Sequence, residues 1–155
     1  MSKAKRKTPV KRQSSGASAT DVGTLQELIV KSIVTGEPLP GGTAPVTFPD
    51  ASFLQRQATV VIDAANFVGK FGSVGGKPVS IASLQSISTD ARTQGEVAYL
   101  HFEPAVLDGD EIALTVQGKI VSGERGAGNL SHIQLRFRRQ GRAWELIGPP
   151  SYSAS

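Results

Sequence analysis

The first strong periodic pattern in the chain lies in residues 24–36. Five positions there fall on one face, spaced three or four residues apart as in an amphipathic helix. They are Leu25, Leu28, Ile29, Ser32 and Ile33. Thr24 and Glu27 fit a capping box, in which each side chain accepts a hydrogen bond from the other's backbone N–H. Gly36 takes a positive φ without steric cost and marks the end of the predicted helix.

Residues 51–72 carry two conflicting patterns. The apolar positions that fall on one helical stripe are Leu54, Ala58, Val61, Ile62, Ala65 and Val68. The β-branched run at 59–62 instead favours a strand, because β-branched side chains lose rotamer freedom in a helix. The stripe is much longer than the run, so we predict a helix that ends near Gly69 or Gly72.

From residue 78 onward, apolar and polar residues alternate. The alternating segments are 78–88, 95–103, 110–121, 130–139 and 143–148. In the third segment one face carries Ile112, Leu114, Val116 and Ile120. In the fourth, Ile133, Leu135 and Phe137 oppose His132, Gln134, Arg136 and Arg138. Such alternation is typical of antiparallel strands with one covered and one wetter face. The stretches at 107–110 and 139–142 predict hairpin turns.

These elements predict an α+β fold, with two N-terminal helices packed on a curved antiparallel sheet of about five strands. The domain would span residues 21–150. It would lie between a disordered basic arm at 1–20 and a flexible tail at 151–155.

The last two predicted strands, residues 132–148, resemble the closing hairpin of the nuclear-transport-factor-like (cystatin-like) cone fold. In that family long strands curve around a helix, and a tryptophan on the final strand, here Trp144, closes the core. The family commonly has a third helix among its strands, which the pattern does not place here. It also includes enzymes, ligand binders and dimerisation modules, so the resemblance implies a fold and selects no activity. A homodimer through the sheet is one partner that it suggests.

The composition excludes several classes of protein. Of the 155 residues 39% are hydrophobic and 19% are charged, which is a globular profile. There is no cysteine, which excludes disulfides and thiolate metal sites. No apolar run approaches the roughly 18 residues of a membrane span. The N-terminus lacks the apolar region of a secretory signal, so we expect an intracellular protein, either nuclear or cytoplasmic.

The positive charge of the chain is concentrated in its first 20 residues. They contain no acid and six cations, which are Lys3, Lys5, Arg6, Lys7, Lys11 and Arg12. Because the whole chain carries +4 and this arm +6, residues 21–155 carry a net −2. Such an arm fits nucleic acid or another acidic partner, a nuclear-import signal, or a solubility tail. Lysine outnumbers arginine and Pro9 interrupts an amphipathic helix, which argues against a transit peptide.

A second cluster of cations lies in the C-terminal hairpin. Its members are Arg136, Arg138, Arg139 and Arg142. Arg136 and Arg138 share the polar face with Lys119 and would extend a phosphate-binding surface. The alternative is a solvated hairpin that discourages edge pairing, with its charges paired to acids of residues 102–111.

His101 and Glu103 are the weak catalytic candidates. They lie two residues apart on a predicted strand and so share a face, on which His132 would join them as part of an acid–base site. Tyr99 or Asp110 would assist. A histidine beside a carboxylate on a solvated sheet is also a common surface arrangement. This pocket is the basis of the alternative function, a small-molecule binder or a hydrolase or isomerase of the cone fold.

Two other classes of protein share features with this sequence. Residues 60–66, with Asp63 and Asn66, resemble the first-strand motif of metal-dependent nucleases of the PIN type, but the further acidic residues of that site are missing. Asp63 would instead be an exposed helix carboxylate. A viral coat protein with a genome-binding arm is a minor alternative. A jelly roll needs eight strands, and the pattern predicts five strands after two helices. We therefore expect a non-enzymatic interaction module whose arm binds a polyanion, with no metal and no cofactor.

Overall fold

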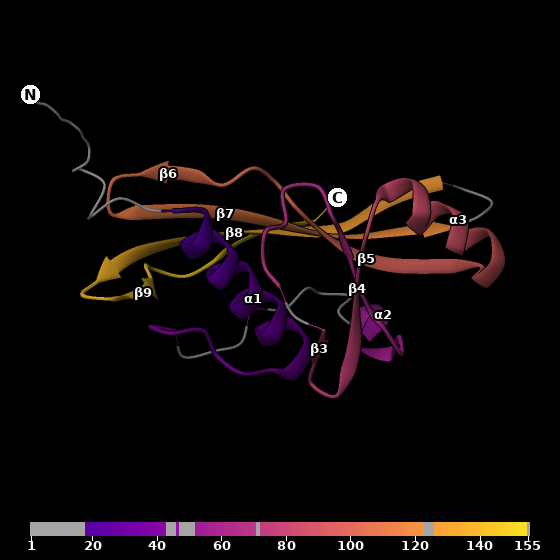
Figure 1. Cartoon of the computed structure of the whole chain (residues 1–155), viewed down its shortest axis with the longest axis horizontal. Coiled ribbons are helices and arrows are strands. Elements are labelled where there is room, and N and C mark those ends of the chain that lie inside the picture. The colour runs from indigo at the N-terminus through magenta and orange to yellow at the C-terminus, as the bar shows by residue number, and fades with distance from the viewer. Residues whose placement is uncertain (1–17, 43–45, 47–51, 71, 123–125, 155) are drawn as a thin grey trace, which may run out of the picture.

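The computed structural model describes residues 18–42, 46, 52–70, 72–122 and 126–154 (Figure 1). The helices are α1 (Ala19–Thr35), α2 (Ser52–Arg56) and α3 (Leu84–Gln94). The strands are β2 (Val60–Asp63), β3 (Ser73–Val74), β4 (Lys77–Ala82), β5 (Glu96–Phe102), β6 (Val106–Asp108), β7 (Glu111–Ser122), β8 (Gly126–Gln140), β9 (Ala143–Leu146) and β10 (Ser151–Ala154).

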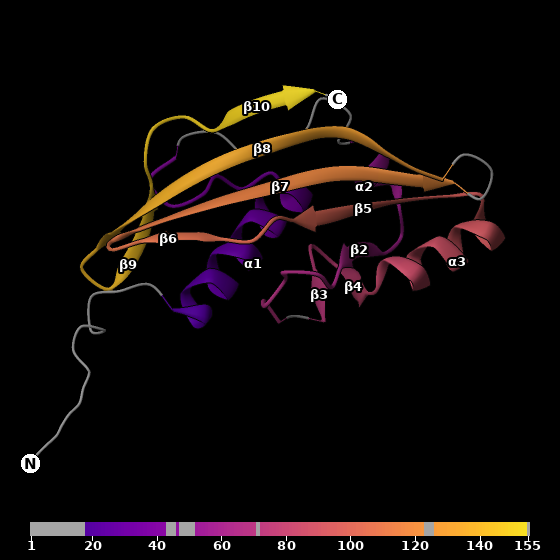
Figure 2. The ribbon, with the colours of Figure 1, turned by 90° about the horizontal axis from the view of Figure 1, so that it is seen from above.

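The predicted fold class is wrong in its architecture. The described residues combine helices with a sheet, as expected, but the sheet has nine strands and is mixed rather than antiparallel. Its order is β10-β8-β7-β5-β2-β4-β3, with β6 paired to β7 and β9 to β8. β2 runs parallel to both β4 and β5, and the other pairs are antiparallel. Figure 2 shows the long strands β7 and β8 arching along the molecule.

Helix α1 was predicted correctly but begins five residues earlier, at Ala19 rather than at Thr24. Its capping box is formed by Ser18 and Asp21, each of which accepts from the other's backbone N–H. The predicted C-terminal stop is confirmed, because Gly36 has φ 82° and its N–H donates to the Ser32 carbonyl.

The main core lies between α1 and one face of the sheet. Its buried helix residues include Leu25, Ile29 and Ile33, and its buried strand residues include Ala98, Leu100, Phe102, Ile112, Leu114, Val116, Ile133, Leu135 and Phe137. The alternation predicted for residues 112–116 and 133–137 is therefore confirmed. Ile120, predicted for the same face, is only half-buried. Trp144 on β9 is buried in this core, as the sequence predicted.

The helix predicted over residues 51–69 does not form. The chain makes only the five-residue α2 and then β2, which lies in the sheet between β4 and β5. Val60 and Ile62 are buried in the main core, while Val61 packs against apolar residues on the opposite face. A strand buried on both faces shows no alternation. The β-branched run was the correct signal, and the helical stripe was misleading.

Residues 78–88, predicted as one strand, are divided between β4 and α3. Ser83 caps the helix, because its Oγ accepts from the Ser86 N–H. Ile87 and Ala91, one helical turn apart, pack with Val97, Tyr99 and Val121 into a second core cluster. In Figure 1 α3 covers the face of the sheet opposite to α1. The sheet is thus covered on both faces where β5 crosses it, and strand β5 carries buried residues on both sides.

Both ends of the domain differ from the predicted boundaries. Of the basic arm predicted at residues 1–20, residues 1–17 lie outside the described part of the chain, and residues 18–20 belong to the beginning of α1. Residues 151–154, expected in a flexible tail, form strand β10 against β8. None of the helices in the described residues is long and apolar enough to cross a membrane.

Candidate functional site

The six cations of the arm lie outside the described residues, but the structure shows where the arm joins the body. Ser18, the first described residue, caps α1. Asp21 in the first turn of that helix binds Arg139 of β8, with 3.3 Å between Oδ2 and Nη2. Figures 1 and 2 show the beginning of α1 at the end of the sheet where β8 turns into β9. The arm therefore joins the domain beside the arginine hairpin.

Two of the four hairpin arginines are paired with one carboxylate. Arg136 and Arg138 lie on one face of β8, and their Nη2 atoms lie 2.6 and 2.8 Å from the two Glu111 oxygens. These two hydrogen bonds lower the pKa of Glu111 below its ordinary value, and the bond from Arg138 has the larger effect. Of the acids in residues 102–111, which were an alternative partner for this hairpin, Glu111 pairs with it. Both arginines remain half or more exposed.

The other two arginines point elsewhere. Arg139 lies on the opposite face, where its guanidinium stacks over the Trp144 ring, 4.7 Å from the ring centre. Arg142 is exposed in the turn between β8 and β9. Lys119 does share the face of Arg136, but Arg136 pairs with Ala113, six residues away along β7. At about 3.4 Å per residue the separation is about 20 Å, beyond the screening length of physiological salt. The cations do not form one continuous patch.

The catalytic candidates lie on the polar face of the sheet, as predicted, on neighbouring strands. His101 of β5 pairs with Gln117 of β7, and Gln117 pairs with His132 of β8. The Gln117 amide donates to Glu103 Oε2 at 2.6 Å. Gln117 thus separates the two histidines and binds the carboxylate that would have served as the partner of His101. Within the described residues, no group of three or more His, Asp or Glu side chains is arranged to hold a metal ion.

The partner of His101 is Asp63, which the sequence analysis placed on an exposed helix face. Asp63 is instead the last residue of β2 and is 6% exposed. Its Oδ2 lies 3.0 Å from His101 Nδ1, and its Oδ1 accepts from the Ala65 N–H. The pKa of Tyr99 is raised, mainly because its hydroxyl is buried and to a lesser extent because the negative charge of Asp63 is nearby. The β-branched run ending in an aspartate was the signal that would have located this residue.

The Asp63–His101 pair has a definite chemical capacity. When Nδ1 of His101 carries the ring proton and donates a hydrogen bond to Asp63, Nε2 has no proton and can act as a hydrogen-bond acceptor or as a base. The histidine side chain is 23% exposed, so solvent reaches it. The same pair also satisfies a buried carboxylate at a strand end, which is a structural role. A catalytic role for His101 stays a prediction.

A pocket of about 380 Å³ lies between α3 and the strands β2 and β4. It is lined by Gln57, Ala58, Thr59, Val61, Ser80, Asp90, Gln94 and Val97. None of His101, Glu103 and His132 lines it, so it is not the pocket that the sequence analysis expected.

No family model matches this sequence, and neither a curated protein nor a solved structure matches it. The resemblance of the C-terminal hairpin to the cone fold therefore stays a prediction, and the function rests on the chain's own residues.

Proposed function

We propose that this protein is a polyanion-binding interaction module whose N-terminal arm binds nucleic acid. The observation that carries the proposal is the density of charge in the arm, six cations between residues 3 and 12 with no acid in the first 20 residues. Cations of this kind bind phosphates by releasing condensed counterions, without reading the base sequence.

The body of the protein contributes little competing positive charge. Residues 21–155 are net negative, and Arg136 and Arg138 are held by Glu111. Arg139 stacks on the Trp144 ring and forms an ion pair with Asp21. The arm is therefore the binding site that the proposal rests on.

The test is a titration of duplex DNA with the full-length protein and with a variant lacking residues 1–17. The deletion ends there so that Ser18 remains to cap α1. Neutralising about six phosphates predicts a log–log salt slope of about −5, so affinity should fall about 1,000-fold for a fourfold rise in salt. The truncated protein should not bind, while its unfolding midpoint should stay unchanged.

The matched control is a full-length double variant, Arg138→Gln with Arg142→Gln, which should keep both the affinity and the slope within a few-fold of wild type. Equal binding by full-length and truncated protein would transfer the site to the hairpin and contradict the proposal. If neither protein binds, the nucleic-acid function is refuted, and the arm is then an import signal or a solubility tail.

A further inference from the structure

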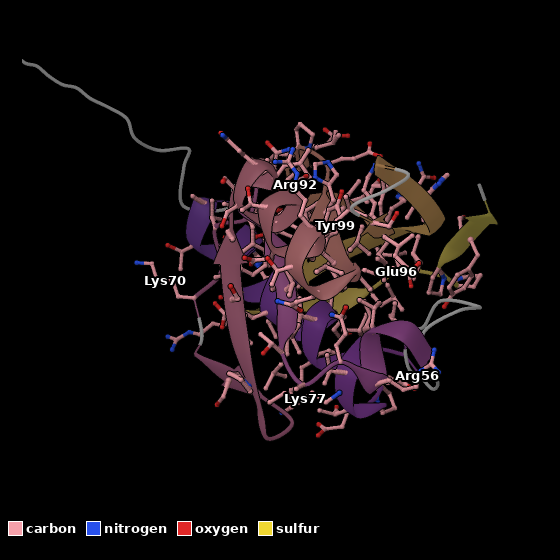
Figure 3. The ribbon with its side chains drawn as sticks, turned by 90° about the vertical axis from the view of Figure 1, so that its right-hand side faces the viewer. Arg56, Lys70, Lys77, Arg92, Glu96 and Tyr99 are labelled. Atoms are coloured by element: carbon pink, nitrogen blue, oxygen red, sulfur yellow. The ribbon has the colours of Figure 1, made fainter. Side chains whose placement is uncertain are left out.

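The pocket beside α3 arises from the way that helix is seated on the sheet. α3 packs on β5 and β7, where Ile87 and Ala91 enter the second core cluster. Val61 of β2 and Ala82 of β4 also pack against this cluster, but Val61 is only partly buried and the neighbouring Ser80 is exposed, so the helix covers this face of β2 and β4 incompletely. Val61 and Ser80, paired across these two strands, form the floor of the pocket. Figure 3 looks at this end of the molecule, where α3, β4 and α2 lie.

The walls come from two other segments. Asp90 and Gln94 lie one turn apart on α3 and so project from one side of the helix. Residues 57–59 close the far end. The Gln57 amide is fully used there, because it accepts from the Ala98 N–H at 2.6 Å and donates to the Ala98 carbonyl at 2.8 Å. It therefore fixes the wall and is not free to bind a ligand.

The remaining polar lining has unused hydrogen-bonding capacity. No hydrogen bond or ion pair within the described residues involves the side chains of Thr59, Ser80, Asp90 or Gln94. Polar side chains gathered around one cavity with no protein partner are available to water or to a ligand. Val61, Val97 and Ala58 provide an apolar surface between them.

The charge of the lining selects the ligand class. Asp90 is the only ionisable residue among the described residues of the lining, and a carboxylate only accepts hydrogen bonds. Arg56, Lys77 and Arg92 lie on the same end of the molecule in Figure 3 but are not lining residues. The Lys77 ammonium is held by the Gln55 carbonyl, and Arg56 has a partner of its own. An anionic ligand would meet Asp90, whereas a cation would be paired by it.

We propose that this pocket binds a small organic cation. Its ammonium group would lie against Asp90, with Gln94 and Ser80 as further hydrogen-bond partners. Its methylene groups would lie over Val61 and Val97. The site is independent of the arm, because the pocket is built entirely from residues 57–97.

The experiment is a titration of the full-length protein, followed by the backbone amide NMR shifts, with three compounds of equal chain length. These are 1,4-diaminobutane, 1,4-butanediol and succinate. The diamine should give saturable shifts at Val61, Asp90 and Gln94, and the diol should bind at least about tenfold more weakly, since it cannot form the charge-assisted bond. Succinate should cause no shift at these positions.

Asp90→Asn should weaken diamine binding at least about tenfold, and because the position is exposed on α3 the spectrum elsewhere should stay unchanged. Asp108→Asn, a carboxylate exposed at the β6–β7 turn, is the matched control and should bind like wild type. The proposal is overturned if the diol binds as well as the diamine, if succinate binds instead, or if Asp90→Asn retains full affinity. Equal losses in both variants would show non-specific attraction to the surface and would also overturn it.

Discussion

Replacing Trp144 with alanine should produce a large loss of stability, and the structure sets its size. The ring is 7% exposed and belongs to the main core. A buried tryptophan removes roughly 200 Å² from water, worth about 5 kcal/mol, and truncations of this kind cost about 3–5 kcal/mol. Nε1 has no hydrogen-bond partner among the described residues, so the ring acts through packing and through the Arg139 cation above it. We expect a loss of about 4 kcal/mol.

Urea unfolding of wild type and Trp144→Ala measures this loss directly, as a lower midpoint with an unchanged slope. For a domain of this size the thermal midpoint should fall by about 10 °C. Tyr152→Ala is the matched control, because that aromatic ring is 47% exposed on β10 and its removal should cost less than about 1 kcal/mol. If the two alanine variants lose the same stability, Trp144 does not close the core and the packing argument fails.

Two further changes test the charged pairs. Because its arginine partners lower the pKa of Glu111, their contribution to stability is present above the ordinary glutamate pKa and is lost as pH falls through the lowered one. The difference in thermal midpoint between wild type and Glu111→Gln should therefore shrink as the pH falls below the ordinary glutamate pKa, and a difference that does not change with pH would contradict the pairing. Asp63→Ala removes the buried partner of His101 and should cost about 1–3 kcal/mol in urea unfolding, whereas a loss below about 0.5 kcal/mol would place Asp63 at the surface.

The parts of the fold that could be predicted from sequence are those with local and regular patterns. α1 and the strands β7 and β8 each present one apolar face over many residues, so their periodicity identified them. The beginning of α1 was missed because two capping patterns follow one another closely in the sequence. Ser18 with Asp21 forms the cap, and Thr24 lies exposed inside the helix.

The parallel part of the sheet could not be predicted in this way. Its central strand β2 has four residues, and the residues that it pairs with in β4 and β5 lie 19 and 38 positions further along the chain. A strand so short carries little periodic signal, and its stability comes from contacts remote in sequence. α3 was missed for a related reason, since only Ile87 and Ala91 of its residues are buried and the segment also alternates.

The candidate sites follow the same division. His101 was found because a histidine and a carboxylate on one strand are visible in sequence. Its actual partner, Asp63, is 38 residues away, and the erroneous helix assignment had turned it towards solvent. The pocket beside α3 required both β2 and α3, neither of which was predicted, so no residue of that site was a candidate.

The pairing of the hairpin arginines also determines how the salt dependence of nucleic-acid binding is to be interpreted. A phosphate that binds Arg136 or Arg138 must displace the Glu111 carboxylate, so one anion replaces another and little counterion is released. The cations of the arm have no acid in their stretch of sequence, so each phosphate contact there releases counterions. A slope of about −5 therefore corresponds to the arm alone, whereas participation of both arginines as free cations would steepen it to about −7. The measured slope therefore reports how many cations neutralise phosphates. A value near −7 would show that Glu111 does not hold the hairpin arginines when DNA is present.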